Sequence, residues 1–164
     1  MKKLIAVALM FSGIVFAQTD KPATLTARQY YEELKAASGL NPLFTSVCFR
    51  TNSPESFDLL GFTKEFEATA KAKGIPVTPE DRKLYARVDG LVIRIYTKGV
   101  QTGEDTLDRD KNNPESWRSE ITGKGHTFHL IVTLSPAGRY RRAVYVDGDA
   151  KVASEGYGKC EPIQ

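Results

Sequence analysis

An alternating run of acids and amides, DRDKNN at residues 108–113, carries the most specific chemistry in this chain. In calcium-binding loops, the oxygen-bearing side chains at positions 1, 3 and 5 converge on one cation. Here those positions hold Asp108, Asp110 and Asn112. Position 6 lacks the usual glycine, and position 12 is Ser119 where a bidentate carboxylate is needed. The run is therefore either an incomplete calcium site or an ordinary solvated loop, and the two departures favour the loop.

A second group of side chains could bind a ligand without catalysing a reaction. Aromatic and guanidinium groups together hold anionic or ring-bearing ligands by stacking and ion pairing. The residues that we expect on the solvated face of a sheet are Tyr85, Arg94, Tyr96, His129, Arg141 and Tyr145. A cross-strand pair such as Tyr85 with Arg94 also stabilises a sheet that binds nothing. Ligand binding by this face is therefore a hypothesis that needs the strand order.

Catalytic motifs are sparse in this sequence. It contains no Gly-x-Ser-x-Gly elbow, no His-Glu-x-x-His motif and no phosphate-binding glycine loop followed by a helix. His126 and His129 are three apart on an expected strand, so they point to opposite faces and do not chelate one metal without a bulge. An acid/base pair of His129 with Glu120 is the catalytic arrangement that the sequence leaves open. We expect no cofactor apart from calcium at 108–112.

Two cysteines, Cys48 and Cys160, lie 112 positions apart. An even number of cysteines in an oxidising compartment favours a disulfide. Two buried thiols or a redox pair are the alternatives, but redox pairs are usually close in sequence, as in Cys-x-x-Cys. We therefore predict a structural Cys48–Cys160 bond.

The first 17 residues predict export. Lys2 and Lys3 form a cationic start, residues 4–16 are almost wholly apolar, and residues 15–17 end in Ala17, which suits a signal peptidase. The apolar run is short for a membrane span, which makes an uncleaved anchor the weaker alternative. We expect a signal peptide at 1–17, a mature chain in the periplasm or outside the cell, and no transmembrane segment after its removal.

Composition indicates one ordinary globular domain over 18–164. The chain is 41% hydrophobic and 26% charged, which is typical of soluble domains. Its net charge of +3 includes Lys2 and Lys3, so almost no excess charge remains after cleavage. Such a balance gives no broad electrostatic surface for nucleic acid. We expect no nucleic-acid partner.

Hydrophobic spacing predicts helices first and strands afterwards. Thr26 with Gln29 forms a capping box ahead of a helix that ends near Gly39. Ser53-Pro54-Glu55 is typical of a second helix start, with an apolar stripe reaching Ala70. A short strand at 44–51 separates the two helices and carries Cys48.

The second half predicts an antiparallel sheet. Asp89-Gly90 between two alternating runs indicates a hairpin over 84–96, and a competing helix from Thr78 extends only one turn. Residues 98–113 are expected to be a polar loop. Three further strands are expected at 117–121, 127–134 and 140–146, followed by a glycine-rich tail at 148–164 that adds one edge strand near Cys160.

These elements predict an α+β fold: two N-terminal helices packed on one face of an antiparallel meander of about five or six strands, in a two-layer single domain. For function, we expect a non-enzymatic domain that binds a small ligand or a cell-envelope protein through its sheet face or the 98–113 loop. A small exported hydrolase or isomerase with its site on the sheet is the alternative. A purely structural envelope protein is the third hypothesis.

Overall fold

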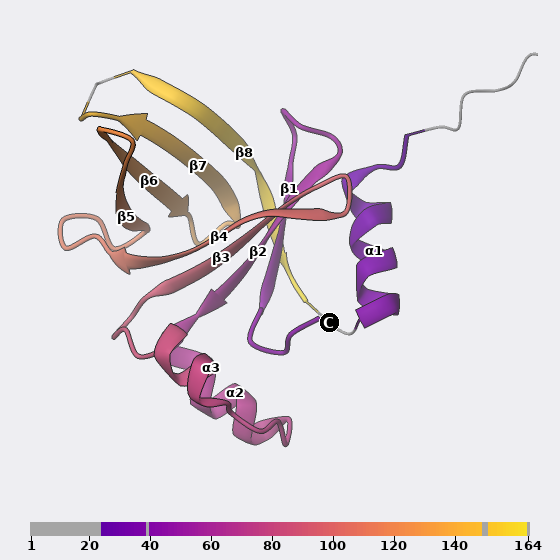
Figure 1. The fold of residues 1–164 in the computed structure, drawn as a ribbon. Coiled ribbons are helices and arrows are strands. Elements are labelled where there is room, and N and C mark those ends of the chain that lie inside the picture. The colour runs from indigo at the N-terminus through magenta and orange to yellow at the C-terminus, as the bar shows by residue number, and fades with distance from the viewer. Residues whose placement is uncertain (1–23, 39, 149–150, 164) are drawn as a thin grey trace, which may run out of the picture.

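The chain forms a closed barrel of eight antiparallel strands in sequence order, with β8 returning to pair with β1. The computed structural model describes residues 24–38, 40–148 and 151–163, and the signal peptide expected at 1–17 lies outside them. Three short helices and one 3-10 turn lie outside the barrel (Figure 1). Every strand therefore pairs with its sequence neighbours, and the described sheet has no edge strand.

The elements follow one another with short connections except between β2 and β3, where the short helices are inserted. The helical elements are α1 (Ala27–Ser38), η1 (Thr63–Glu65), α2 (Phe66–Ala72) and α3 (Pro79–Leu84). The strands are β1 (Ser46–Arg50), β2 (Ser56–Phe62), β3 (Leu91–Thr97), β4 (Val100–Arg109), β5 (Ser116–Gly123), β6 (His126–Leu134), β7 (Arg139–Val146) and β8 (Val152–Pro162).

The closed barrel shows that the predicted two-layer α+β fold was wrong. The main error is the second helix, because most of its first half is the strand β2. Phe57 and Leu59 pack outside the barrel beneath α1, whereas Leu60 points into the interior, and all three are buried. A strand buried on both faces loses the apolar-polar alternation that identifies strands, and its apolar residues then match helical spacing by coincidence.

The hairpin predicted at 84–96 is also wrong. Thr78 and Asp81 form a capping box, and α3 ends at Leu84, where the first predicted strand begins. Residues 85–90 form no strand, whereas the predicted second strand is present as β3. Val88, the residue directly before the predicted Asp89-Gly90 turn, is 94% exposed. The hairpin that the structure contains instead joins β3 to β4. Its two-residue turn consists of Lys98 and Gly99, which both have positive φ. Most of the predicted polar loop at 98–113 is therefore the long strand β4.

Other predictions are confirmed. In the capping box of α1, the Gln29 side chain accepts a hydrogen bond from the Thr26 amide at 2.8 Å. The three strands at 117–121, 127–134 and 140–146 correspond to β5, β6 and β7. The strand predicted near Cys160 is present as β8, but it is longer than expected and pairs with both β7 and β1, so it is not the edge strand that was predicted. Cys48 and Cys160 face each other across β1 and β8 and are joined by the predicted disulfide.

Two apolar clusters hold the barrel together. One lies outside, where Tyr31 of α1 meets Phe49 and Phe57 edge-on with ring centroids 5.8 Å away in each case. Figure 1 shows α1 against the side of the barrel, and α2 and α3 beyond one of its ends. The other cluster fills part of the interior, where Leu60, Leu107 and Trp117 converge from three strands. The helices therefore lie outside the barrel, and the interior cluster is formed by strand residues.

Closure between β1 and β8 depends on a glycine. A Cβ atom added at Gly158 would lie 1.9 Å from the carbonyl oxygen of Phe49, so no side chain fits there without backbone movement. We expect Gly158→Ala to lower the free energy of unfolding by about 1–3 kcal/mol, the usual cost of overpacking. Gly123→Ala, with nothing within 4 Å of the added Cβ, is the matched control. Equal urea midpoints for the two variants would show that the close approach of β1 and β8 does not matter.

Candidate ligand site at the open end of the barrel

The two ends of the barrel differ in how they are filled. At one end Trp117 reaches across the interior, donates from Nε1 to the carbonyl oxygen of Asp89 at 3.3 Å, and packs against Phe62. At the other end lie the β1–β2, β3–β4, β5–β6 and β7–β8 connections (Figure 1). Trp117 and Phe62 fill part of the interior at the first end, and the hollow inside the barrel is lined by residues nearer the second end, which we call the open end.

A hollow of about 220 Å³ lies at this open end. Its lining is largely apolar, and it comes from β3 to β7: Ile95, Gly103, Glu104, Asp105, Ile121, Phe128, Leu130, Arg142 and Val144. Ile121 and Phe128 face each other on β5 and β6 and are 52% and 37% exposed. Exposed large apolar side chains around a concave opening are typical of a binding site for an apolar ligand.

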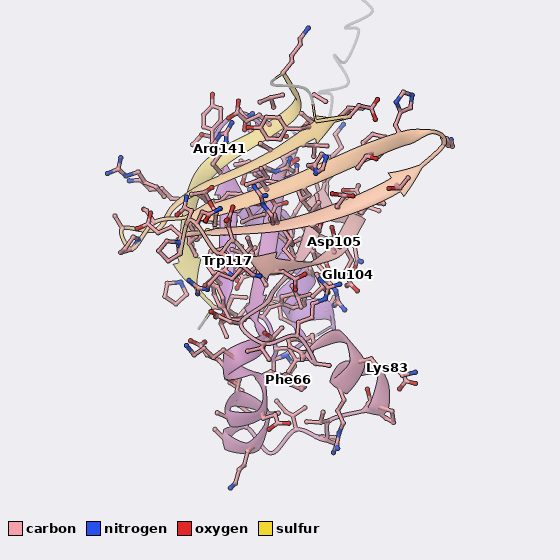
Figure 2. The ribbon with its side chains drawn as sticks, turned by 90° about the vertical axis from the view of Figure 1, so that its left-hand side faces the viewer. Phe66, Lys83, Glu104, Asp105, Trp117 and Arg141 are labelled. Atoms are coloured by element: carbon pink, nitrogen blue, oxygen red, sulfur yellow. A yellow bond between two sulfur atoms is a disulfide. The ribbon has the colours of Figure 1, made fainter. Side chains whose placement is uncertain are left out.

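Strands β4 and β5 share few backbone pairs beside this hollow. Only Asp108 with Arg118 and Arg109 with Trp117 are in register between β4 and β5. Beyond these pairs the strands diverge, and the Ser119 hydroxyl donates to the Asp105 carboxylate where backbone pairing ends. Figure 2 shows Glu104 and Asp105 next to each other on β4, below the long β5–β6 hairpin. This divergence widens the open end toward the side of the barrel.

A buried ionic cluster adjoins the hollow. Asp58 is completely buried, and its Oδ2 lies 3.6 Å from the Nε atoms of both Arg50 and Arg142. The Tyr140 hydroxyl donates a hydrogen bond of 2.6 Å to the same oxygen. Gly156 leaves room for this arrangement, because a Cβ atom there would lie 2.6 Å from the Arg50 side chain. Two guanidinium groups therefore share one buried carboxylate.

Burial shifts the protonation equilibria within this cluster. It raises the pKa of the Asp58 carboxyl group, although Arg142 and Arg50 oppose that change. It also lowers the pKa of Arg50. Burial, followed by the neighbouring Asp58 carboxylate, raises the pKa of Tyr140 well above its usual value, so Tyr140 keeps the proton that it donates. The charged groups are thus held in a site that solvates them poorly.

The cluster leaves hydrogen-bonding capacity unused. Among the described residues, the buried Nε atoms of Arg50 and Arg142 and the Oδ1 atom of Asp58 have no hydrogen-bond partner. The 3.6 Å separations exceed hydrogen-bond length, so these contacts are ion pairs only. Buried polar groups are nearly always hydrogen-bonded in folded proteins. The interior therefore has donors available for a further acceptor.

The six residues predicted to form one binding face are divided between different places. Tyr85 lies after α3 and stacks on Phe66, with centroids 4.0 Å apart, and burial raises its pKa. Tyr96 is buried against Phe57. Arg94 pairs with Glu104 and lies over the Phe44 ring. These three residues are engaged by the protein itself.

The other three of the six come together on the outer surface. His129 and Tyr145 are directly opposite on β6 and β7, and Arg141 donates to the Tyr145 hydroxyl at 3.4 Å. A shallow hollow of about 220 Å³ lies here, lined by Arg118, His129, Ile131, Tyr145 and Gly148. The prediction of a ligand at these residues stays untested, and its natural location is this outer hollow.

The two residues of the suggested acid/base pair lie beside each other, and a catalytic role for them stays a prediction. His129 and Glu120 are opposite each other on β6 and β5, with Nδ1 and Oε2 3.6 Å apart. Both line a larger polar hollow of about 620 Å³ beside the divergence of β4 and β5. The pair therefore has space for a substrate, and it is open to solvent.

The calcium-like run ends β4 and begins the β4–β5 connection. Asp108 pairs with Arg87 at 2.8 Å, and Asp110 pairs with Arg118 at 3.2 Å. Asp110 also accepts a hydrogen bond from the Asn112 amide at 2.9 Å. In the described part of the chain, no group of three or more His, Cys, Asp or Glu side chains is arranged to hold a metal ion. Asp108 and Asp110 therefore each have an arginine partner.

Sequence reasoning missed the buried cluster and the apolar hollow. Asp58 was placed on a helix, and Arg50 was placed in a strand without a partner. The sequence does contain one signal: Asp58 is a single acid within the otherwise apolar run at 57–62. A buried acid requires a cationic partner, so this position indicates that an arginine or lysine lies nearby. The hollow itself had no sequence signal, because its lining comes from five strands.

Comparison of the chain with protein-family models, curated proteins and solved structures returned no match. Across residues 24–38, 40–148 and 151–163, the helices are too short or too polar to cross a bilayer. The fold and the site define an up-and-down antiparallel barrel with one open, apolar end.

Proposed function

We propose that this protein is an exported, non-enzymatic binding protein that takes a small apolar ligand into the open end of its barrel. One observation carries the proposal: the hollow at that end is lined by apolar side chains that remain solvent-exposed, including Ile121 and Phe128. A soluble protein gains stability by burying such residues, so their exposure at a concave site favours a ligand that covers them. An eight-stranded barrel has an interior wide enough for one small ligand.

Export is part of the same proposal. The Cys48–Cys160 disulfide supports it, because structural disulfides form and persist in oxidising compartments. The cationic and apolar start of the sequence supports it independently. A binding protein in the periplasm or outside the cell would meet small apolar molecules directly.

The mouth of the barrel can be tested with one substitution. Phe128→Asp places a charge on the lining of the hollow, and we expect it to weaken binding of 1-octanol at least tenfold, because the charge must lose water when the ligand enters. The change should be measured by isothermal titration calorimetry of the folded variant. Val88→Asp is the matched control, since Val88 is an exposed apolar residue that does not line the hollow.

Wild-type and Val88→Asp proteins should then bind with the same affinity. Failure of the wild type to bind 1-octanol and related compounds of this size would end the proposal of an apolar ligand. Equal binding by wild type and Phe128→Asp would place the ligand elsewhere on the molecule.

A small hydrolase or isomerase is the second candidate. The observation that favours it is the 3.6 Å contact of His129 with Glu120 on the edge of the large polar hollow. Such a pair can transfer a proton to or from a bound substrate. This candidate uses the outer surface of the barrel, so it is distinguished from ligand binding by where a small molecule contacts the protein.

A further inference from the structure

We propose that the ligand of the open end is an anionic amphiphile: a single carboxylate received by Arg142, with a short apolar chain in the hollow. This inference rests on the proposed function and names the class of its ligand. Arg142 is the residue that connects the two parts of the site, because it lines the apolar hollow and also pairs with Asp58.

The guanidinium group of Arg142 is buried and poorly satisfied. The residue is 9% exposed, and its Nε has no hydrogen-bond partner in the described structure. Its one polar contact among the described residues is the 3.6 Å ion pair with Asp58. A guanidinium group carries five N–H donors in a planar fork that suits the two oxygens of a carboxylate. A ligand carboxylate would supply the acceptors that the protein does not.

Charge around the site points in the same direction. Asp58 is shared by two arginines, so the buried cluster has more positive than negative groups. Two other carboxylates line the hollow, and both have partners. Glu104 pairs with Arg94, and Asp105 accepts hydrogen bonds from the Ser119 hydroxyl and the Thr106 amide. Asp105 keeps its negative charge, because both of its donors are neutral. The excess positive charge is local to the cluster of Arg50, Arg142 and Asp58, and Arg142 is the member of that cluster that lines the hollow, which favours an anion at this residue.

The volume of the hollow sets the length of the apolar part. At about 30 Å³ for each water-sized group, 220 Å³ accommodates roughly seven such groups. The chain of octanoate beyond its carboxylate has this size. A longer chain would extend past Ile121 and Phe128 into solvent.

The ligand class is tested by comparing octanoate, 1-octanol and octylamine by titration calorimetry at neutral pH. We expect octanoate to bind roughly tenfold to a hundredfold more tightly than 1-octanol, which corresponds to one charged hydrogen-bonded contact. Octylamine should bind most weakly. Equal affinities for octanoate and 1-octanol would overturn the anionic head while leaving an apolar site in place. Absence of binding by all three would overturn the proposed function as well.

Two substitutions locate the anion. Arg142→Gln should remove the preference for octanoate over 1-octanol and leave the affinity for 1-octanol within about threefold. Arg139→Gln is the matched control, because Arg139 is an exposed arginine on the same strand. Asp58→Asn should act in the opposite direction and raise the affinity for octanoate roughly threefold or more, since it removes the carboxylate that competes for Arg142.

The two substitutions are expected to change the affinity for octanoate in opposite directions, so the test remains decisive if one variant folds poorly. A folded Asp58→Asn variant that binds octanoate more weakly than wild type would contradict the proposal. So would an Arg142→Gln variant that keeps the full preference for octanoate.

Discussion

Asp58→Ala is expected to lower the free energy of unfolding by about 3–5 kcal/mol, because it leaves two buried arginines without their shared counter-ion. Both Arg50 and Arg142 lie 3.6 Å from Asp58 Oδ2, and the carboxylate is completely buried. The Tyr140 hydroxyl would also lose its acceptor in the interior. Chemical unfolding followed by the fluorescence of Trp117, the single tryptophan of the chain, measures the change directly.

An exposed pair of the same chemistry provides the control. Arg28 and Glu161 form two hydrogen bonds of 2.7 and 2.9 Å, yet both side chains are about half exposed. Glu161→Ala should therefore cost less than about 1 kcal/mol, as exposed ion pairs usually do. Similar costs for Asp58→Ala and Glu161→Ala would show that burial of the cluster contributes nothing to stability.

Removing the disulfide is expected to have an effect of similar size. The Cys48–Cys160 bond closes a loop of 112 residues, for which the chain-entropy model gives about 5 kcal/mol of stability. The bond also joins β1 to β8, the pairing that closes the barrel. The double variant Cys48→Ala/Cys160→Ala should unfold at a lower denaturant concentration, since alanine introduces no polar group at the buried position of Cys48.

Wild-type protein in a strong reductant is the comparison for this variant. The reduced wild type and the double variant should have similar unfolding midpoints, both below that of the oxidised protein. If all three unfold at the same midpoint, the bond does not stabilise the barrel.

Local signals in the sequence identified the elements whose environment is simple. The capping box of Thr26 and Gln29 marked α1, and the strands β5 to β7 were found from alternation and turn residues. Alternation succeeded there because those strands have one face toward the interior and one toward solvent. The even cysteine number likewise identified the disulfide without any knowledge of the fold.

Elements buried on two faces were not predictable in the same way. In β2, the outer residues pack under α1 and the inner residues face the barrel, so the polar positions that reveal a strand are missing. The opposite error occurred in β4, whose many polar residues resemble a loop because both of its faces reach solvent over part of its length. Closure of the barrel depends on the pairing of β1 with β8. The predicted Cys48–Cys160 bond brings these two segments together, but hydrophobic patterning does not reveal that they pair as neighbouring strands.

The candidate site was less predictable than the fold. His129 and Tyr145 were found because each is a conspicuous residue on a correctly predicted strand. The pairing of Arg142 with Asp58 joins β7 to β2, and it could not be inferred while β2 was assigned to a helix. The partner of a buried charge can be inferred from a sequence only once the strands that carry both residues are correctly assigned.

The most direct test of ligand binding inside the barrel is the response of methyl NMR signals to sodium octanoate. Leu130 and Ile131 are adjacent on β6, but Leu130 lines the inner hollow and Ile131 lines the outer one. Saturable shifts at Leu130, Ile95 and Val144, with little change at Ile131, are the result that we predict. Shifts concentrated at the Ile131 methyl groups, which lie beside His129 and Tyr145 in the outer hollow, and no shift at Leu130 would contradict an interior site and place the ligand on the outer surface.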